Sequence, residues 1–82
     1  MVEAEIYVTL KKMVSDPQGL IIRQALSSLN YREVEEVRMG KLITIKLNIA
    51  DRREAERRID QMCQRLLANP VVEEYSFKIR EI

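Results

Sequence analysis

Apolar side chains stand at every second position from Val2 to Leu10, with charged or polar residues between them. A period of two places alternate side chains on opposite faces of an extended chain, so this segment predicts a strand with one buried face. The same alternation returns from Leu42 to Ile49 and from about Glu73 to Ile82. A chain with three such strands has to form a sheet with an apolar face, and another layer must cover that face.

Two segments between these strands carry helical signals instead. Asp16-Pro17 is a helix start, because Asp16 can accept a free N–H as N-cap and proline suits the first helical position. Asn30 is a plausible left-handed end for this helix. An apolar stripe at helical spacing lies between the two signals and consists of Ile22, Ala25, Leu26 and Leu29.

The second helix is predicted to begin at Asp51, with Glu54 reaching back from the third helical position as in a capping box. Asn69-Pro70 ends it, because the residue before a proline disfavours helical geometry. The apolar positions of this helix are Ala55, Ile59, Met62, Cys63, Leu66 and Leu67.

A fourth strand is predicted from about Glu33 to Met39, where Val34, Val37 and Met39 alternate with charges. Gly40-Lys41 has the composition of a tight turn, so we expect this strand to form a hairpin with the strand that follows.

The predicted order is therefore β-α-β-β-α-β within a single α+β domain spanning residues 1–82. This is the ferredoxin-like arrangement, a four-stranded antiparallel sheet with two helices on one face. We expect the opposite face to be bare and polar, carrying Glu3, Glu5, Tyr7, Thr9, Thr44, Lys46, Ser76 and Lys78.

Composition excludes several functions. The chain has 14 basic and 13 acidic residues, so the basic excess typical of nucleic-acid binders is absent. One cysteine and no histidine exclude an internal disulfide, a zinc site and His-dependent nucleophiles. The longest aliphatic runs have three residues, far short of the roughly 20 that span a membrane. These features favour a small, cytoplasmic, non-catalytic module, and we expect it to bind no cofactor, nucleic acid or membrane itself.

Three remaining features have ordinary explanations that we favour. Cys63 falls on the apolar stripe, where a buried thiol is inert. The arginine-rich helix from Asp51 to Arg65 is nearly balanced by acids, so pairs such as Glu54 with Arg58 explain it better than a phosphate site. Tyr7 resembles the base-stacking aromatic of an RNA-binding sheet, but the strand from Leu42 has no aromatic partner for it.

Four segments resemble one family over essentially the full length of the chain. They are Tyr7-Val8-Thr9-Leu10-Lys11, Asp16-Pro17-Gln18-Gly19, Val37-Arg38-Met39-Gly40-Lys41 and Leu66-Leu67-Ala68-Asn69-Pro70-Val71-Val72-Glu73. In this order and spacing they resemble PurS, the small subunit of phosphoribosylformylglycinamidine (FGAM) synthase. Asn30 stands where the family commonly has glycine, and the second helix is more basic than usual; neither departure touches the four segments.

The resemblance implies a role within a ligase complex of de novo purine biosynthesis. A glutaminase subunit releases ammonia, and a large synthetase subunit uses it with ATP and magnesium to convert formylglycinamide ribonucleotide into the amidine. The small subunit implied here lacks catalytic residues, forms a homodimer with a tetramer as the larger alternative, bridges the other two subunits and assists ammonia transfer.

The candidate residues for docking a partner lie in the turns and at helix ends. Arg38 and Lys41 flank the expected hairpin turn, and an arginine can bind a carboxylate with two hydrogen bonds. The other candidates lie at a helix start and a helix end, and are Asp16, Gln18, Gly19, Asn69 and Pro70. For all of them the alternative is a purely structural role. Two other functions stay open: a free-standing regulatory domain of the same strand order that binds a small molecule, and an RNA-binding module.

Overall fold

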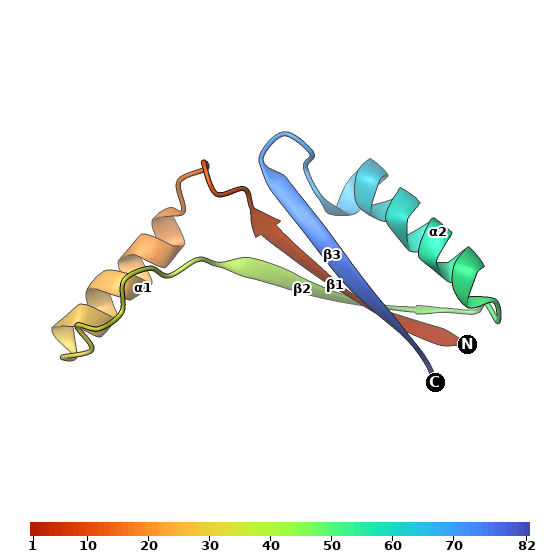
Figure 1. Cartoon of the computed structure of the whole chain (residues 1–82), viewed down its shortest axis with the longest axis horizontal. Coiled ribbons are helices and arrows are strands. Elements are labelled where there is room, and N and C mark those ends of the chain that lie inside the picture. Colours follow the sequence, from red (N-terminus) through yellow and green to blue (C-terminus); the bar gives the residue numbers. More distant parts are fainter.

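The computed structural model describes all 82 residues as one antiparallel sheet with two helices (Figure 1). The three strands lie in the order β2-β1-β3, so the first strand of the chain is central. In chain order the elements are β1 (Val2–Leu10), α1 (Pro17–Ser28), β2 (Gly40–Leu47), α2 (Arg52–Met62), its π-helical continuation η1 (Cys63–Leu67) and β3 (Glu73–Glu81).

The predicted fourth strand does not exist, so the four-stranded ferredoxin-like prediction is wrong for this chain. Residues 34–39 form no strand, and Gly40 is the first residue of β2 instead of a turn residue. Gly40 does not have a positive φ, so no tight hairpin turn can form there. The physical reason lies in the preceding residues: the N–H of Met39 donates to the side chain of Asp16, which holds this segment against the start of α1.

The prediction that both helices cover one face is wrong as well. Only α2 lies over the sheet, while α1 projects away from it, with residues 30–39 running back along the helix and into β2 (Figure 1). The molecule measures 49 × 28 × 14 Å and its radius of gyration is 16.3 Å. A compact chain of this length has a radius of gyration of about 12 Å, so a single copy leaves α1 without a sheet to cover.

The core lies between β1 and α2. Val2, Ala4, Ile6 and Val8 are fully buried, as the alternating pattern predicts. They pack with buried residues of α2 and η1, and with partly buried residues of β2 and β3, namely Ala55, Ile59, Cys63, Ile43, Ile45, Leu47, Tyr75 and Phe77.

The caps of α2 are partly as predicted. The side chain of Asp51 accepts a hydrogen bond from the N–H of Arg53, 3.0 Å away, so the N-cap is confirmed. Glu54 does not complete a capping box, because its carboxylate pairs forward with Arg57 at 2.6 Å and with Arg58 at 3.5 Å. These pairs confirm that the charged face of the helix is laced by its own ion pairs.

Helix α1 begins and ends where predicted. Asp16 is its N-cap and accepts from the N–H of Gly19 at 2.9 Å, and Asn30 follows the helix with a φ of 74°. Its apolar residues are nevertheless largely exposed: Leu20 keeps 51%, Ile21 64% and Leu29 66% of their accessible surface. Neither helix is long and apolar enough to serve as a membrane span.

Candidate functional site

Lys11 joins three separate segments at one end of the sheet. It follows β1, and its N–H donates to the carbonyl of Val72, 2.8 Å away. Its Nζ donates to the carbonyl of Pro70 at 2.8 Å, and its own carbonyl accepts from Nη2 of Arg38 at 3.0 Å. Two of the docking candidates, Arg38 and Pro70, are therefore brought to the same end of the molecule by one lysine.

Glu73 makes a second junction beside it. One carboxylate oxygen accepts from the N–H of Asn69 at 2.7 Å, and the other lies 3.6 Å from Nζ of Lys41. The Glu73 side chain is only 15% exposed, whereas that of Lys41 is 65% exposed. The carboxylate is thus a half-buried anchor, and the ammonium group stays accessible.

Asp16 connects the start of α1 to this end of the sheet. Its buried carboxylate accepts from the N–H of Gly19 and, at 2.6 Å, from the N–H of Met39. These backbone donors, first that of Met39, hold the pKa of Asp16 below its usual value, with Arg38 adding a smaller effect. Because both oxygens are engaged inside the chain, Asp16 works as a structural latch.

Gly19 is part of the same latch. A Cβ added there would lie 2.1 Å from the carbonyl oxygen of Val37, so only glycine allows this approach. Gln18, between the two, is exposed.

The structure therefore brings together all four segments on which the family resemblance rests. We define the docking end as the surface formed by Lys11, Arg38, Lys41, Asn69, Pro70 and Glu73. Lys11 and Glu73 were missing from the sequence-based candidates, since each acts through contacts with residues far along the chain. The signal that would have found them is their position at the ends of two of the four segments.

The docking end also exposes apolar side chains. Leu66 keeps 83% and Val71 77% of their surface. They flank the loop after η1, whose π-helical turn interrupts the regular end of α2. An open hollow of ≈ 590 Å³ lies next to this loop, lined by Lys11, Cys63, Gln64, Ala68, Pro70, Glu73, Glu74 and Tyr75.

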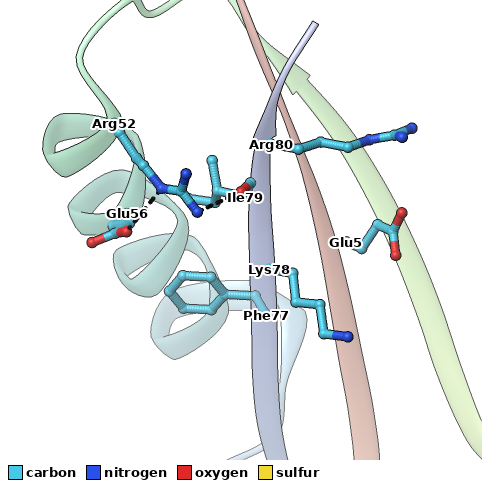
Figure 2. Close-up of a pocket in the computed structure, with 7 residues that line it drawn as sticks. All are labelled: Glu5, Arg52, Glu56, Phe77, Lys78, Ile79 and Arg80. Atoms are coloured by element: carbon cyan, nitrogen blue, oxygen red, sulfur yellow. Dashed lines mark hydrogen bonds and ion pairs between the residues drawn. The ribbon is translucent and has the colours of Figure 1, made fainter.

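A second hollow, of ≈ 480 Å³, lies along β3 and faces α2 (Figure 2). Most of its charged groups are already engaged: Arg52 donates to the carbonyl of Ile79 at 2.8 Å and lies 3.6 Å from Glu56, and Arg80 pairs with Glu3. Glu5 accepts from Tyr7, and only Lys78 has no hydrogen bond or ion pair. This hollow presents no cluster of free charge for a ligand.

The side chains of Cys63 and Tyr7 are both engaged within the chain. Cys63 is fully buried, and burial together with nearby Asp60 raises the pKa of its thiol. No three Cys, Asp or Glu side chains are grouped to hold a metal ion. Tyr7 donates to Glu5 at 3.0 Å, and Nζ of Lys78 lies 6.0 Å from the centre of its ring, so the bare polar face is occupied by its own contacts.

The fold and the site define a small α+β module in which the segments of the family resemblance meet at one exposed end of the sheet. Comparison with known proteins identifies it further. Residues 3–81 match the model of the PurS family, described as phosphoribosylformylglycinamidine (FGAM) synthase, and the chain belongs to this family.

Individual relatives agree with that assignment. The chain is 39% identical to the PurS subunit of phosphoribosylformylglycinamidine synthase from Bacillus subtilis, over 100% of this chain and 96% of the relative. The crystal structure of PurS from Methanocaldococcus jannaschii superimposes with a TM-score of 0.90 at 35% identity, covering 100% of this chain and 99% of that one. That structure is described as one of the subunits of formylglycinamide ribonucleotide amidotransferase in the purine biosynthetic pathway.

A third comparison concerns an assembled complex. A chain in the structure of PurLQS from Thermotoga maritima superimposes with a TM-score of 0.86 at 28% identity, covering 98% of this chain and 99% of that one. The chain is therefore a PurS-type subunit of FGAM synthase. The high scores over whole chains also show that this open arrangement, with three strands and a projecting α1, is shared by solved relatives.

Proposed function

We propose that this chain holds the glutaminase and the ATP-dependent synthetase subunits of FGAM synthase together and assists the passage of ammonia between them. The observation that carries this proposal is the docking end, where three of the four segments shared with the family meet through Lys11 and Glu73, and to which Asp16 links the fourth segment through Met39. Ammonia that reaches bulk water is protonated or lost, so the transfer needs an interface that excludes solvent. This chain contributes contacts between subunits. The synthetase subunit uses ATP and magnesium, and the complex works in the cytoplasm.

Arg38 and Lys41 are the residues we assign to docking. One guanidinium nitrogen of Arg38 donates to the carbonyl of Lys11, and the rest of the guanidinium is exposed. Lys41 is held by Glu73 with most of its side chain accessible. The chain thus positions both charges, Arg38 against a neutral carbonyl and Lys41 beside a single carboxylate, and leaves both groups accessible to acidic groups on a partner. Asn69 and Pro70 lie in the adjoining loop. Gln18 and Gly19 lie in the first turn of α1, next to Asp16.

The test is reconstitution of amidine synthesis from purified subunits of one source. The wild-type chain should restore the glutamine-dependent reaction and leave the ammonia-driven reaction of the synthetase little changed. The double substitution Arg38→Ala with Lys41→Ala should weaken assembly of the complex and lower the glutamine-dependent rate together. Arg53→Ala, an exposed arginine of α2 outside the docking end, is the matched control. Assembly that is unchanged by the double substitution would rule out this assignment.

Self-association is the second part of the proposal. One face of α1 is apolar and exposed, and Ile43, Ile45 and Leu47 of β2 are only half-buried because α2 lies over β1 and β3 and leaves the β2 part of the same apolar face uncovered. In a dimer, the apolar face of α1 in one copy can cover the half-buried apolar residues of β2 in the other, because every copy carries both regions. We therefore propose a homodimer as the smallest assembly, with a tetramer formed from dimers as the larger alternative.

A further inference from the structure

The three most exposed large apolar side chains of the chain lie at one end of the sheet, and we call them the apolar patch. They are Met13, which is 99% exposed, Leu66 and Val71. The segment after β1 carries Met13, and the segment that leads through η1 to β3 carries the other two; both lie at the end where β1 finishes and β3 begins (Figure 1). Single apolar residues on a surface need no explanation, but the most exposed ones gathered at one end mark a binding surface.

The exposure of Leu66 is caused by the π-helical turn. The buried residues along α2, η1 and the residue that follows are Ala55, Ile59, Cys63 and Ala68. Their spacing is four, four and then five, because the N–H of Ala68 donates to the carbonyl of Cys63 at 3.1 Å. In a continuous α-helix Leu66 would lie on the buried stripe, seven positions after Ile59, so the sequence-based expectation for Leu66 is wrong. The π-turn rotates this side chain outward, and such turns are frequent at functional sites.

The loop that carries Val71 is held by Asn69. The side-chain oxygen of Asn69 accepts from the N–H of Val71 at 3.0 Å, and its carbonyl accepts from the N–H groups of Val72 and Glu73 at 3.2 and 2.7 Å. Its own N–H donates to the Glu73 carboxylate at 2.7 Å. Val71 is therefore presented by a loop that is already ordered, and an ordered surface loses less conformational entropy on binding.

Met13 is presented in a similar way. The N–H of Val14 donates to the carbonyl of Lys11 at 2.9 Å, which closes a turn with Met13 at its tip. The N–H of Lys11 donates to the carbonyl of Val72 at 2.8 Å, so this turn is fixed against the loop of Val71. Hydrogen bonds within the chain thus join the two segments that carry the apolar patch.

Basic side chains outnumber acidic ones around the apolar patch. Lys12 directly precedes Met13, and Arg65 directly precedes Leu66. The exposed basic residues of this end are Lys11, Lys12, Arg38, Lys41 and Arg65, and the exposed acidic ones are Glu36 and Glu74. A complementary surface therefore combines apolar side chains with carboxylates.

The exposed apolar helix of a second copy does not have this chemistry. Helix α1 contains no acidic residue, and its one charged side chain is that of Arg23. Packing of α1 against the apolar patch would bring arginine towards basic residues. The charges therefore indicate that the occupant of the apolar patch is a different chain.

We propose that the apolar patch anchors a segment of another synthase subunit in which exposed apolar side chains are flanked by aspartate or glutamate. Leu66 and Val71 supply most of the apolar contact, and Arg65 and Lys12 supply the ion pairs beside it. This inference rests on the proposed function and specifies the chemistry of the partner that the docking end accepts.

Substitution of two patch residues tests the apolar contact. Leu66→Ser combined with Val71→Ser should raise the Kd for one of the purified glutaminase and synthetase subunits about tenfold or more. Both side chains are exposed, so the circular dichroism spectrum and thermal midpoint of the isolated chain should stay as in wild type. Ile82→Ser changes an exposed apolar residue at the opposite end of β3 and should leave the Kd unchanged.

Charge reversal tests the carboxylates of the partner. Arg65→Glu keeps the apolar patch but should repel the acidic groups beside it, so the Kd should rise and the difference from wild type should shrink at about 0.5 M salt, where charges are screened. Arg53→Glu makes the same reversal on α2, away from the docking end, and is the control. An equal effect of the two reversals would show that only net charge matters and would overturn the proposed partner chemistry.

The outcomes separate this proposal from the proposed function. If Arg38→Ala with Lys41→Ala weakens assembly and Leu66→Ser with Val71→Ser does not, the docking end stands and the apolar anchor is overturned. A wild-type chain that binds neither subunit would overturn both. Light scattering of the isolated patch variant gives a further check: a loss of self-association would show that the patch binds a second copy and would contradict the proposal.

Discussion

Asp16 stabilises the fold only while its carboxylate is ionised. Its pKa is held below the usual value by the N–H groups of Met39 and Gly19. A lowered pKa in the folded state gives a stabilisation that is present above the unfolded value, about 3.9, and is lost as pH falls through the folded value. The latch between α1 and the segment before β2 should therefore weaken in acid, below about pH 4.

Substitution of Asp16 by asparagine tests this effect. Asp16→Asn keeps one acceptor for Gly19 but presents an NH₂ group to the N–H of Met39, so the thermal midpoint should fall at pH 7. The difference between wild type and variant should shrink between pH 4 and pH 2, because the wild-type carboxyl is then protonated as well. Thermal melts followed by circular dichroism at several pH values measure it. A difference that is constant with pH would show that the charge is irrelevant.

Gly19 gives a steric prediction at the same latch. In Gly19→Ala the new Cβ would lie 2.1 Å from the Val37 carbonyl, so the backbone must move, and we expect a loss of about 1–3 kcal/mol in urea unfolding. Gly40→Ala is the comparison, since its Cβ would meet Thr9 and Val8 no closer than 3.0 Å. If the two substitutions cost the same, the close approach at Gly19 is not what fixes this position.

At the scale of the elements, the two helices should respond differently to loss of apolar side chains. Ile59 is fully buried between α2 and the sheet. Ile59→Ala should cost about 2–5 kcal/mol of unfolding free energy, because it leaves a cavity that the sheet cannot close. The measurement is the urea midpoint at high protein concentration, and an unchanged midpoint would mean that α2 does not hold the core.

The sequence predicted those elements whose cause is local. The alternation at Val2–Leu10, the proline after Asp16 and the cap at Asp51 each act through neighbouring residues, and all three elements form where expected. The prediction of a fourth strand was wrong because the apolar pattern at Val34 and Val37 is equally compatible with a segment that lies against α1. Which of the two forms depends on the Asp16–Met39 hydrogen bond, and that contact joins residues 23 positions apart.

The candidate site was predictable to the same extent. Arg38 and Lys41 became candidates as charges beside a hairpin turn that does not form, and Asn69 and Pro70 became candidates because the helix end is visible in the sequence. Lys11 and Glu73 were not, because each functions through tertiary contacts, such as the one between Lys11 and Pro70 across 59 residues. A charged residue at a strand end is normally solvated, so nothing local separates these two from Glu74.

The whole molecule is too extended to be explained as an independent folding unit. Its radius of gyration of 16.3 Å and the exposed face of α1 both indicate surface that another chain covers. If that chain is a second copy, stability must depend on concentration, because association stabilises the folded state by mass action. We expect the thermal midpoint of the wild-type chain to rise steadily over a hundredfold increase in protein concentration.

Leu20 and Ile21 allow this prediction to be tested against a matched control. Both side chains are exposed on α1 in a single copy, so Leu20→Ser with Ile21→Ser should cost a single chain little, yet it removes apolar area from the proposed interface. The double variant should melt at a lower temperature than wild type at high concentration and lose the concentration dependence. Leu66→Ser, which alters a still more exposed side chain at the docking end, should keep the wild-type dependence. If the α1 variant keeps the dependence and Leu66→Ser loses it, copies associate through the docking end, and the projecting helix is then available to the other subunits of the synthase.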